Sequence, residues 1–148
     1  MIKIFDFDGV ICDSAFEAFR VALATVGAIS DPFSDRADNL YPQFYDKRIS
    51  VGPAWNYYYV MQELLFNKWE PWIECCESTR FVKLFFECRT RSQKQTQQWL
   101  ELNPVYEGVL EILSSHRIII LTNKNKEAVE TLLKYNNVNY EAIYSMPD

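Results

Sequence analysis

Apolar and polar residues follow one another along the chain in a pattern that predicts strands near both ends and helices between them. The run Ile2 to Phe7 is apolar, β-branched and aromatic and stops at Gly9, as expected of a short buried strand. Residues 117–121 form a second such run, and its four consecutive branched apolar residues predict a parallel strand covered on both faces. A third, weaker strand is predicted at residues 142–144.

Helical patterns occupy much of the remaining sequence. Ser14 stands three residues before Glu17, which is the spacing of a capping box, and this helix is predicted to stop at Gly27. Residues 30–52 resemble a loop, and residues 89–98 are so polar that we expect them to face solvent. Further helices are predicted at about 53–69, at 72–102 as one long helix or two joined by a bend, at 108–115 and at 126–135.

This order of elements predicts the architecture. Strands that alternate with helices are typical of an α/β fold with a parallel sheet. We expect residues 1–13 and 104–148 to form a Rossmann-like parallel sheet core, short at about three strands. Residues 14–103 would form an inserted α-helical domain over one end of that sheet.

Composition narrows the class of protein. The 148 residues are 49% hydrophobic and 24% charged, which is enough to bury a core without a disulfide or a structural metal. A disordered tail, a collagen-like repeat and a disulfide scaffold are excluded. The formal charge of -5 argues against nucleic acid as the main partner, but it allows a small phosphorylated substrate held by a local cation or metal.

The cysteines and the absence of targeting signals suggest a location. The four cysteines show no CxxC or Cys/His metal spacing, so reduced thiols are the simplest interpretation. The N-terminal residues lack the apolar stretch of a signal peptide, and no apolar run approaches the roughly 20 residues that span a bilayer. We therefore expect a cytoplasmic protein with no membrane partner.

Two polar clusters follow the first two predicted strands. Asp6 and Asp8 lie at the end of the first strand, and Thr122, Asn123 and Lys124 come after the second. Ligands of open parallel sheets bind at the carboxyl ends of the strands. On an extended backbone, Asp6 and Asp8 would point to the same side, and two such charges are unfavourable unless a cation or a proton intervenes. Hard oxygen donors favour Mg²⁺.

Each cluster has a plainer interpretation. Asp6 to Gly9 reads Asp-Phe-Asp-Gly and could be an ordinary acidic turn, and residues 122–124 could be a polar loop that leads into a helix cap. The position of both clusters at successive strand ends favours a site over two unrelated loops.

The residues around these clusters resemble a known family. Residues 4–14 read Ile-Phe-Asp-Phe-Asp-Gly-Val-Ile-Cys-Asp-Ser and are similar to the first motif of the haloacid dehalogenase (HAD) superfamily, especially its phosphoglycolate-phosphatase-like members. Residues 118–124, Ile-Ile-Ile-Leu-Thr-Asn-Lys, resemble the second motif, and residues 104–113 resemble the segment that precedes it. The insert at 14–103 lies where these proteins place a helical cap domain.

The resemblance implies an Mg²⁺-dependent phosphatase that acts on a small phosphorylated metabolite, a phosphate monoester, through an aspartyl-phosphate. Asp6 would be the nucleophile, and Asp8 would act as general acid and then general base. Asp6 and Asp8 would also hold the metal, through the Asp6 carboxylate and the Asp8 backbone carbonyl. The Thr122 hydroxyl and the Asn123 backbone N–H would bind the phosphate.

The sequence departs from the family pattern near its end. A lysine and an acidic pair are expected after the third strand, and neither is visible. Lys124 is the nearest cationic candidate, and Asp148 could reach the metal. The chain can then be read as a fragment, as a naturally short phosphatase of weak or altered activity, or as a degenerate member that binds metal, phosphate or a partner without turnover. Phosphoryl transfer to a sugar and cleavage of a carbon–phosphorus bond are other reactions of the family.

Aromatic residues concentrate in the insert, and three roles are open to them. At helical spacing they could form the core of the cap, the interface of a homodimer, or a surface that closes over Asp6 and selects the substrate. The residues are Trp55, Tyr57, Tyr58, Tyr59, Phe66, Trp69, Trp72, Phe81, Phe85 and Phe86.

Overall fold

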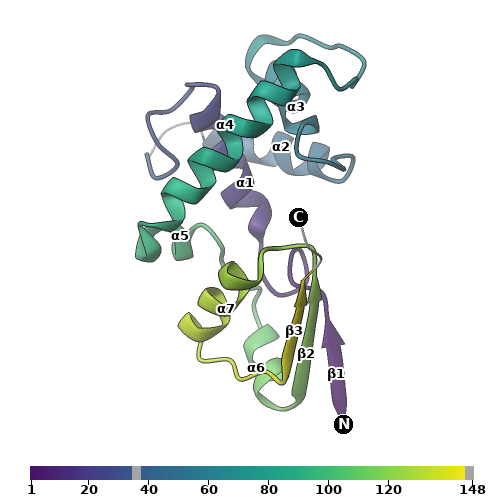
Figure 1. Cartoon of the computed structure of the whole chain (residues 1–148), viewed down its shortest axis with the longest axis vertical. Helices are drawn as coiled ribbons and strands as arrows, with labels where there is room; N and C mark the ends of the chain where they lie inside the picture. Colours follow the sequence, from purple (N-terminus) through teal and green to yellow (C-terminus); the bar gives the residue numbers. More distant parts are fainter. Residues whose placement is uncertain (35–37, 146–148) are drawn as a thin grey trace. The chain divides into compact units, whose positions relative to one another are not determined.

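The computed structural model describes residues 1–34 and 38–145, and its strands and helices follow the predicted order (Figure 1). The strands are β1 (Ile2–Phe5), β2 (Arg117–Thr122) and β3 (Ala142–Ser145). The helices are α1 (Ser14–Thr25), α2 (Tyr41–Arg48), α3 (Asn56–Phe66), α4 (Cys76–Gln93), α5 (Thr96–Glu101), α6 (Val109–Ser114) and α7 (Lys126–Tyr135), with a 3-10 turn at Asp38–Leu40. The predicted α/β class is confirmed.

The chain forms two compact units. The first consists of Met1–Ser14 and Leu100–Asp148 and carries the three strands. The second, Ala15–Trp99, is helical. The role of the insert as a cap stays a prediction.

The three strands of the first unit form one parallel sheet in the order β1-β2-β3. On one side of β2, Ile4 pairs with Ile119 and Phe5 pairs with Ile120, and on the other side Ile120 pairs with Ile143. Parallel neighbours need a crossover connection, and α7 lies in the connection between β2 and β3. Because all three strands run in the same direction, their carboxyl ends share one edge of the sheet.

Helices cover one face of this sheet. α6 contacts β2 and α7 contacts β3, and on the covered face Ile120 is fully buried and Ile143 is 7% exposed. Side chains alternate between the two faces of a strand, and on the opposite face Ile4 is 66% exposed and Leu121 is 56% exposed. The prediction that the strand at 117–121 is covered on both faces is therefore wrong for the part of the chain that the structure describes. A branched apolar run indicates a strand, but what covers each face depends on elements elsewhere in the chain.

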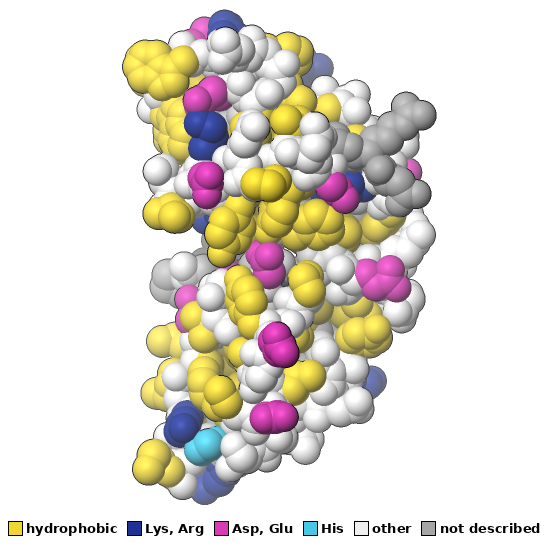
Figure 2. Space-filling view, turned by 180° about the vertical axis from the view of Figure 1, so that it is seen from behind, with side chains coloured by type: hydrophobic (Ala, Val, Ile, Leu, Met, Phe, Trp, Pro, Cys, Tyr) yellow, Lys and Arg dark blue, Asp and Glu magenta, His cyan; other side chains and the backbone are white. Residues whose placement is uncertain are grey.

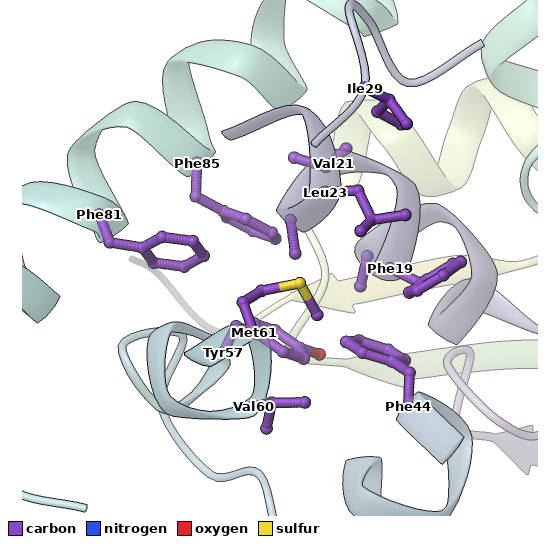
Figure 3. Close-up of a cluster of buried hydrophobic side chains, with 12 residues drawn as sticks. Phe19, Val21, Leu23, Ile29, Phe44, Tyr57, Val60, Met61, Phe81 and Phe85 are labelled. Atoms are coloured by element: carbon purple, nitrogen blue, oxygen red, sulfur yellow. The ribbon is translucent and has the colours of Figure 1, made fainter. Parts of the chain in front are cut away.

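A cluster of buried side chains holds the second unit together (Figure 3). Phe44 of α2 stacks on Tyr57 of α3 with ring centroids 5.5 Å apart, and Tyr57 in turn stacks on Phe85 of α4 at 5.5 Å. Met61 of α3 and Phe19 of α1 are fully buried in the same cluster. The row of rings therefore joins three helices that are separate in the sequence, and aromatic pairs of this kind stabilise a core beyond their buried area.

The aromatic residues of the insert differ in burial: some are buried, some are exposed, and Trp55, Tyr58 and Trp72 are intermediate. Tyr57, Tyr59, Phe81 and Phe85 are at most 5% exposed, as expected of a core. Trp69, in contrast, is 73% exposed. Phe66 and Phe86 are exposed as well. A homodimer through such a surface stays a prediction.

The polar stretch at residues 89–98 does not wholly face solvent. Arg89 donates two hydrogen bonds to the carboxylate of Glu17, at 2.9 and 2.5 Å, and Glu17 is fully buried. The spacing of Glu17 from Ser14 suggested a capping box, whereas the structure places both of its carboxylate oxygens on Arg89. Local spacing does not reveal a partner 72 residues away in the sequence.

The predicted loop at 30–52 contains a helix, α2. Pro42 lies in its first turn, where a proline is tolerated because the N–H that it lacks would have no helical acceptor. Phe44 is the buried residue of this short helix. Because Phe44 is the single buried residue of this helix, the sequence shows no repeat of apolar residues that would predict a helix here.

The structure also corrects where the two long helices predicted in the insert begin and end. The helix expected at 53–69 ends at Phe66, because Asn67 takes a left-handed conformation with φ 51° and caps it. The stretch at 72–102 becomes helical only at Cys76 and divides into α4 and α5, so the prediction of two helices joined by a bend is the correct alternative.

Two further observations concern the single histidine and membrane spanning. The single histidine, His116, is partly exposed beyond the end of α6, and Figure 2 shows it in cyan at the surface. Within the described residues, no helix is both long and apolar enough to cross a membrane.

Candidate functional site

The end of β1 turns sharply through a tight loop. The backbone carbonyl of Phe7 accepts hydrogen bonds from the N–H groups of Ile11 and Cys12, at 2.9 and 3.2 Å. The Gly9 N–H donates to the carbonyl of Cys12 at 2.9 Å, and Gly9 has φ +77°, a conformation that L side chains rarely adopt. Phe7 and Ile11 are buried beneath the loop, and these two apolar side chains anchor it. This anchoring keeps Asp6 and Asp8 at the carboxyl edge of the sheet.

The two aspartates lie in different surroundings. Asp6 is exposed, and its Oδ1 accepts a hydrogen bond from the Phe7 N–H at 2.6 Å. The Asp8 side chain is 30% exposed, and its Oδ1 lies 3.1 Å from Nζ of Lys124. The structure therefore pairs Asp8 with a cation and leaves Asp6 exposed to solvent.

The end of β2 brings the second cluster to the same edge. Phe5 and Ile120 are partners in the parallel register, so Asp6 and Thr122 both follow shortly after paired positions. Thr122 is 4% exposed, and its Oγ1 accepts a hydrogen bond from the Lys124 N–H at 3.0 Å. That bond uses the oxygen as acceptor and leaves the hydroxyl hydrogen available to donate. Asn123 is exposed beside it.

The segment after β2 is fixed at both ends. At its start the Lys124 N–H is held by Thr122, and at its end the Asn125 side chain accepts a hydrogen bond from the Ala128 N–H at 3.2 Å. Asn125 is thus the N-cap of α7, as expected of an asparagine at this position. The polar-loop interpretation of residues 122–124 is therefore partly right, since a helix cap does follow. The same hydrogen bonds place the Lys124 side chain against Asp8.

Cys12 is a buried neighbour of the site that the sequence did not single out. It is 1% exposed, and burial raises the pKa of its thiol to about 12, an effect that the positive charge of Lys124 opposes. The thiol is therefore protonated at neutral pH and is a poor nucleophile. The only sequence signal for Cys12 was its place within the motif.

Mg²⁺ is the metal that the family resemblance implies. Among residues 1–34 and 38–145, no group of three or more His, Cys, Asp or Glu side chains could hold a metal ion. Mg²⁺ often binds through one or two carboxylates and takes its other ligands from water and substrate phosphate. Asp6 and Asp8 supply hard oxygen donors of that kind, so they fit Mg²⁺ as a partial set of ligands. Asp148, the further acidic candidate, lies outside the described residues.

Two known structures were found to resemble this chain. A crystal structure described as "Putative Phosphatase from Clostridium difficile" is 18% identical with a TM-score of 0.57, and the match covers 97% of this chain and 60% of that one. Another is described as "putative beta-phosphoglucomutase from Thermotoga maritima". It is 20% identical with a TM-score of 0.49, and the match covers 96% of this chain and 60% of that one. A TM-score of 0.49 is too low to support a structural argument. No family model and no curated protein matches the sequence.

The fold of the Clostridium difficile protein is the one that the sequence motifs predicted. A likeness at 18% identity shows a shared fold, here a Rossmann-like parallel core with added helices. This chain spans 60% of the length of that solved chain. Fold alone does not specify chemistry, so the function must be argued from the residues at the edge of the sheet.

Proposed function

We propose that the chain is a HAD-like phosphatase that hydrolyses a small phosphate monoester with the help of Mg²⁺. The observation that carries the proposal is the arrangement at one sheet edge: Asp6 and Asp8 follow β1, and the Thr122 hydroxyl follows the neighbouring strand β2. The fold shared with a structure described as a "Putative Phosphatase" supports it. The proposal includes the substrate class, a phosphate monoester, and the covalent intermediate, an aspartyl-phosphate.

The first step is attack by the Asp6 carboxylate. One of its oxygens forms a bond to phosphorus, the ester P–O bond breaks, and an aspartyl-phosphate results. Asp6 suits this role because it is exposed and one of its oxygens is oriented by the Phe7 N–H. Asp8 gives a proton to the departing alkoxide.

The second step releases phosphate. Asp8 accepts a proton from a water molecule as that water attacks phosphorus, and the P–O bond to Asp6 breaks. The Thr122 hydroxyl donates to a phosphoryl oxygen, and the Asn123 backbone N–H can assist. The Asp6 carboxylate and the Asp8 backbone carbonyl would hold Mg²⁺, which would offset the repulsion between carboxylate and phosphate.

Phosphate release from a panel of phosphate monoesters, with Mg²⁺ present, tests the proposal. Asp6→Asn keeps the shape of the side chain and removes the nucleophilic oxygen, so we expect it to abolish release. Asp46→Asn is the matched control, because Asp46 is an exposed residue of α2 in the other unit. If Asp6→Asn releases phosphate as fast as the unchanged chain, the mechanism is wrong.

A second candidate function is binding of metal and phosphate without turnover. The observation that favours it is the small ligand set, since the described residues offer no group of three metal-ligating side chains. Calorimetry with Mg²⁺ and inorganic phosphate, beside the monoester assay, separates the two functions. Binding without release of phosphate supports the second candidate, and robust turnover excludes it.

A further inference from the structure

Lys124 presents its ammonium group to the site in a fixed position. The side chain is 11% exposed, and its Nζ lies 3.1 Å from Asp8 Oδ1. A lysine on a protein surface usually extends its ammonium group into water. Here the charge is held instead beside the Asp8 carboxylate.

The backbone explains why this side chain is directed inward. The Lys124 N–H is bound by Thr122 Oγ1, and the next residue, Asn125, caps α7. Lys124 is therefore fixed between the end of a strand and the start of a helix. Its aliphatic stem crosses from β2 toward the loop after β1, where Asp8 lies.

The ammonium group retains capacity for a second acceptor. An ammonium carries three N–H donors, and among the described residues the acceptor bound to Lys124 Nζ is Asp8. Two donors are then available to a ligand that reaches the same edge. A phosphoryl group carries the acceptor oxygens and the negative charge that such donors bind.

The charge balance of the site makes this donor necessary. The whole chain has a formal charge of -5, and the nucleophilic Asp6 carboxylate adds negative charge where the phosphate would bind, so a phosphate dianion is repelled both nearby and from a distance. Lys124 places a positive charge beside Asp8 at this edge of the sheet.

From these contacts we infer that Lys124 is a phosphate-binding residue, whose ammonium group bridges Asp8 and a phosphoryl oxygen of the ligand. The inference rests on the proposed function for the location of the phosphate, and it deepens that function by assigning the cation. The competing explanation is a purely structural ion pair that neutralises Asp8. Such a pair would affect stability but would not affect phosphate affinity.

Calorimetric titration of the whole chain with inorganic phosphate, with Mg²⁺ present, tests the inference. Lys124→Met keeps the aliphatic stem and removes the charge, so we expect its phosphate dissociation constant to rise at least about tenfold. Lys124→Arg keeps the charge and should stay within about threefold of the unchanged chain. The control is Lys126→Met, since Lys126 is 55% exposed and pairs with Glu130 of its own helix.

The outcomes separate this inference from the proposed function. Unchanged affinity in Lys124→Met overturns the inference, even if the chain proves to be a phosphatase. Equal loss in Lys124→Arg and Lys124→Met, with both variants folded by circular dichroism, also overturns it, because charge would not be the cause. No phosphate binding by the unchanged chain overturns it as well. Binding that depends on Lys124 without any hydrolysis supports it and contradicts the phosphatase proposal instead.

Discussion

Arg89 donates two hydrogen bonds to the carboxylate of Glu17, so α4 and α1 are joined by a buried ion pair. Glu17 is fully buried, while the Arg89 side chain is 26% exposed and its guanidinium lies 4.8 Å from the centroid of the Phe85 ring. Trp99 Nε1 approaches the same carboxylate at 3.4 Å. The pair thus connects the start of the second unit with its end.

Arg89→Met should destabilise the chain, because it leaves the Glu17 carboxylate buried without its cation. We expect the free energy of unfolding to fall by about 3 kcal/mol, as when one partner of a buried pair is removed. Urea denaturation followed by circular dichroism measures the change. Arg91→Met, at an exposed position of the same helix, is the control and should change stability little. A loss of less than about 1 kcal/mol in Arg89→Met would show that the pair is not structural.

Gly9→Ala should destabilise the loop after β1 through its backbone alone. Gly9 has φ +77°, and a Cβ built there meets nothing within 4 Å, so strain and not a clash is expected. The cost should be about 1 kcal/mol, the penalty of a left-handed conformation for an L residue. Gly52→Ala is the matched control, because Gly52 has no positive φ and a Cβ built there would lie 3.6 Å from Asn56 Oδ1, an ordinary contact. Equal stability of the two variants in urea would contradict the prediction.

Ile120→Ala and Leu121→Ala compare the two faces of β2 at adjacent positions. Ile120 is fully buried, so its truncation should cost about 3 kcal/mol. Leu121 is 56% exposed, and its truncation should cost less than about 1 kcal/mol. Urea unfolding of both variants provides the measurement. A cost for Leu121→Ala as large as that for Ile120→Ala would mean that something covers the second face.

Cys12 should resist alkylation in the folded chain. Burial raises the pKa of its thiol to about 12 from an ordinary 9.0, so the thiolate is rare until the pH approaches 12. Because the folded pKa is raised, burial of the neutral thiol contributes stability below pH 9 that is lost as the pH rises from 9 to 12. Iodoacetamide at pH 8 with mass spectrometry should label exposed Cys76 and leave Cys12 unlabelled until urea is added. Labelling of both cysteines at equal rates in the folded chain would contradict the prediction.

Thr122→Val should impair phosphate release while the chain stays folded. Valine has nearly the shape of threonine but removes both the acceptor for the Lys124 N–H and the proposed donor to phosphate. We expect kcat/KM for a phosphate monoester to fall by about a hundredfold, as for other single donors to a developing oxyanion. Thr90→Val, at an exposed position of α4, controls for the change of residue type. Full activity in Thr122→Val would remove this hydroxyl from the site.

Much of the core architecture was determined by the local sequence. Branched apolar residues bounded by Gly9 and by Thr122 define β1 and β2, because side-chain shape and turn residues act over a few positions. The order of strands and helices then predicted a parallel sheet, and parallel strands necessarily bring their carboxyl ends to one edge. Asp6, Asp8 and Thr122 could therefore be assigned to a common edge from the order of residues alone.

Contacts between distant segments were decided only by the tertiary structure. The pairs Lys124–Asp8 and Arg89–Glu17 join residues 116 and 72 positions apart, and no local period records such a partner. The exposure of Leu121 is of the same kind, because burial of a strand face depends on which elements pack against it. Secondary structure follows from short-range preferences, whereas ion pairing and the burial of a given face follow from the packing of whole elements.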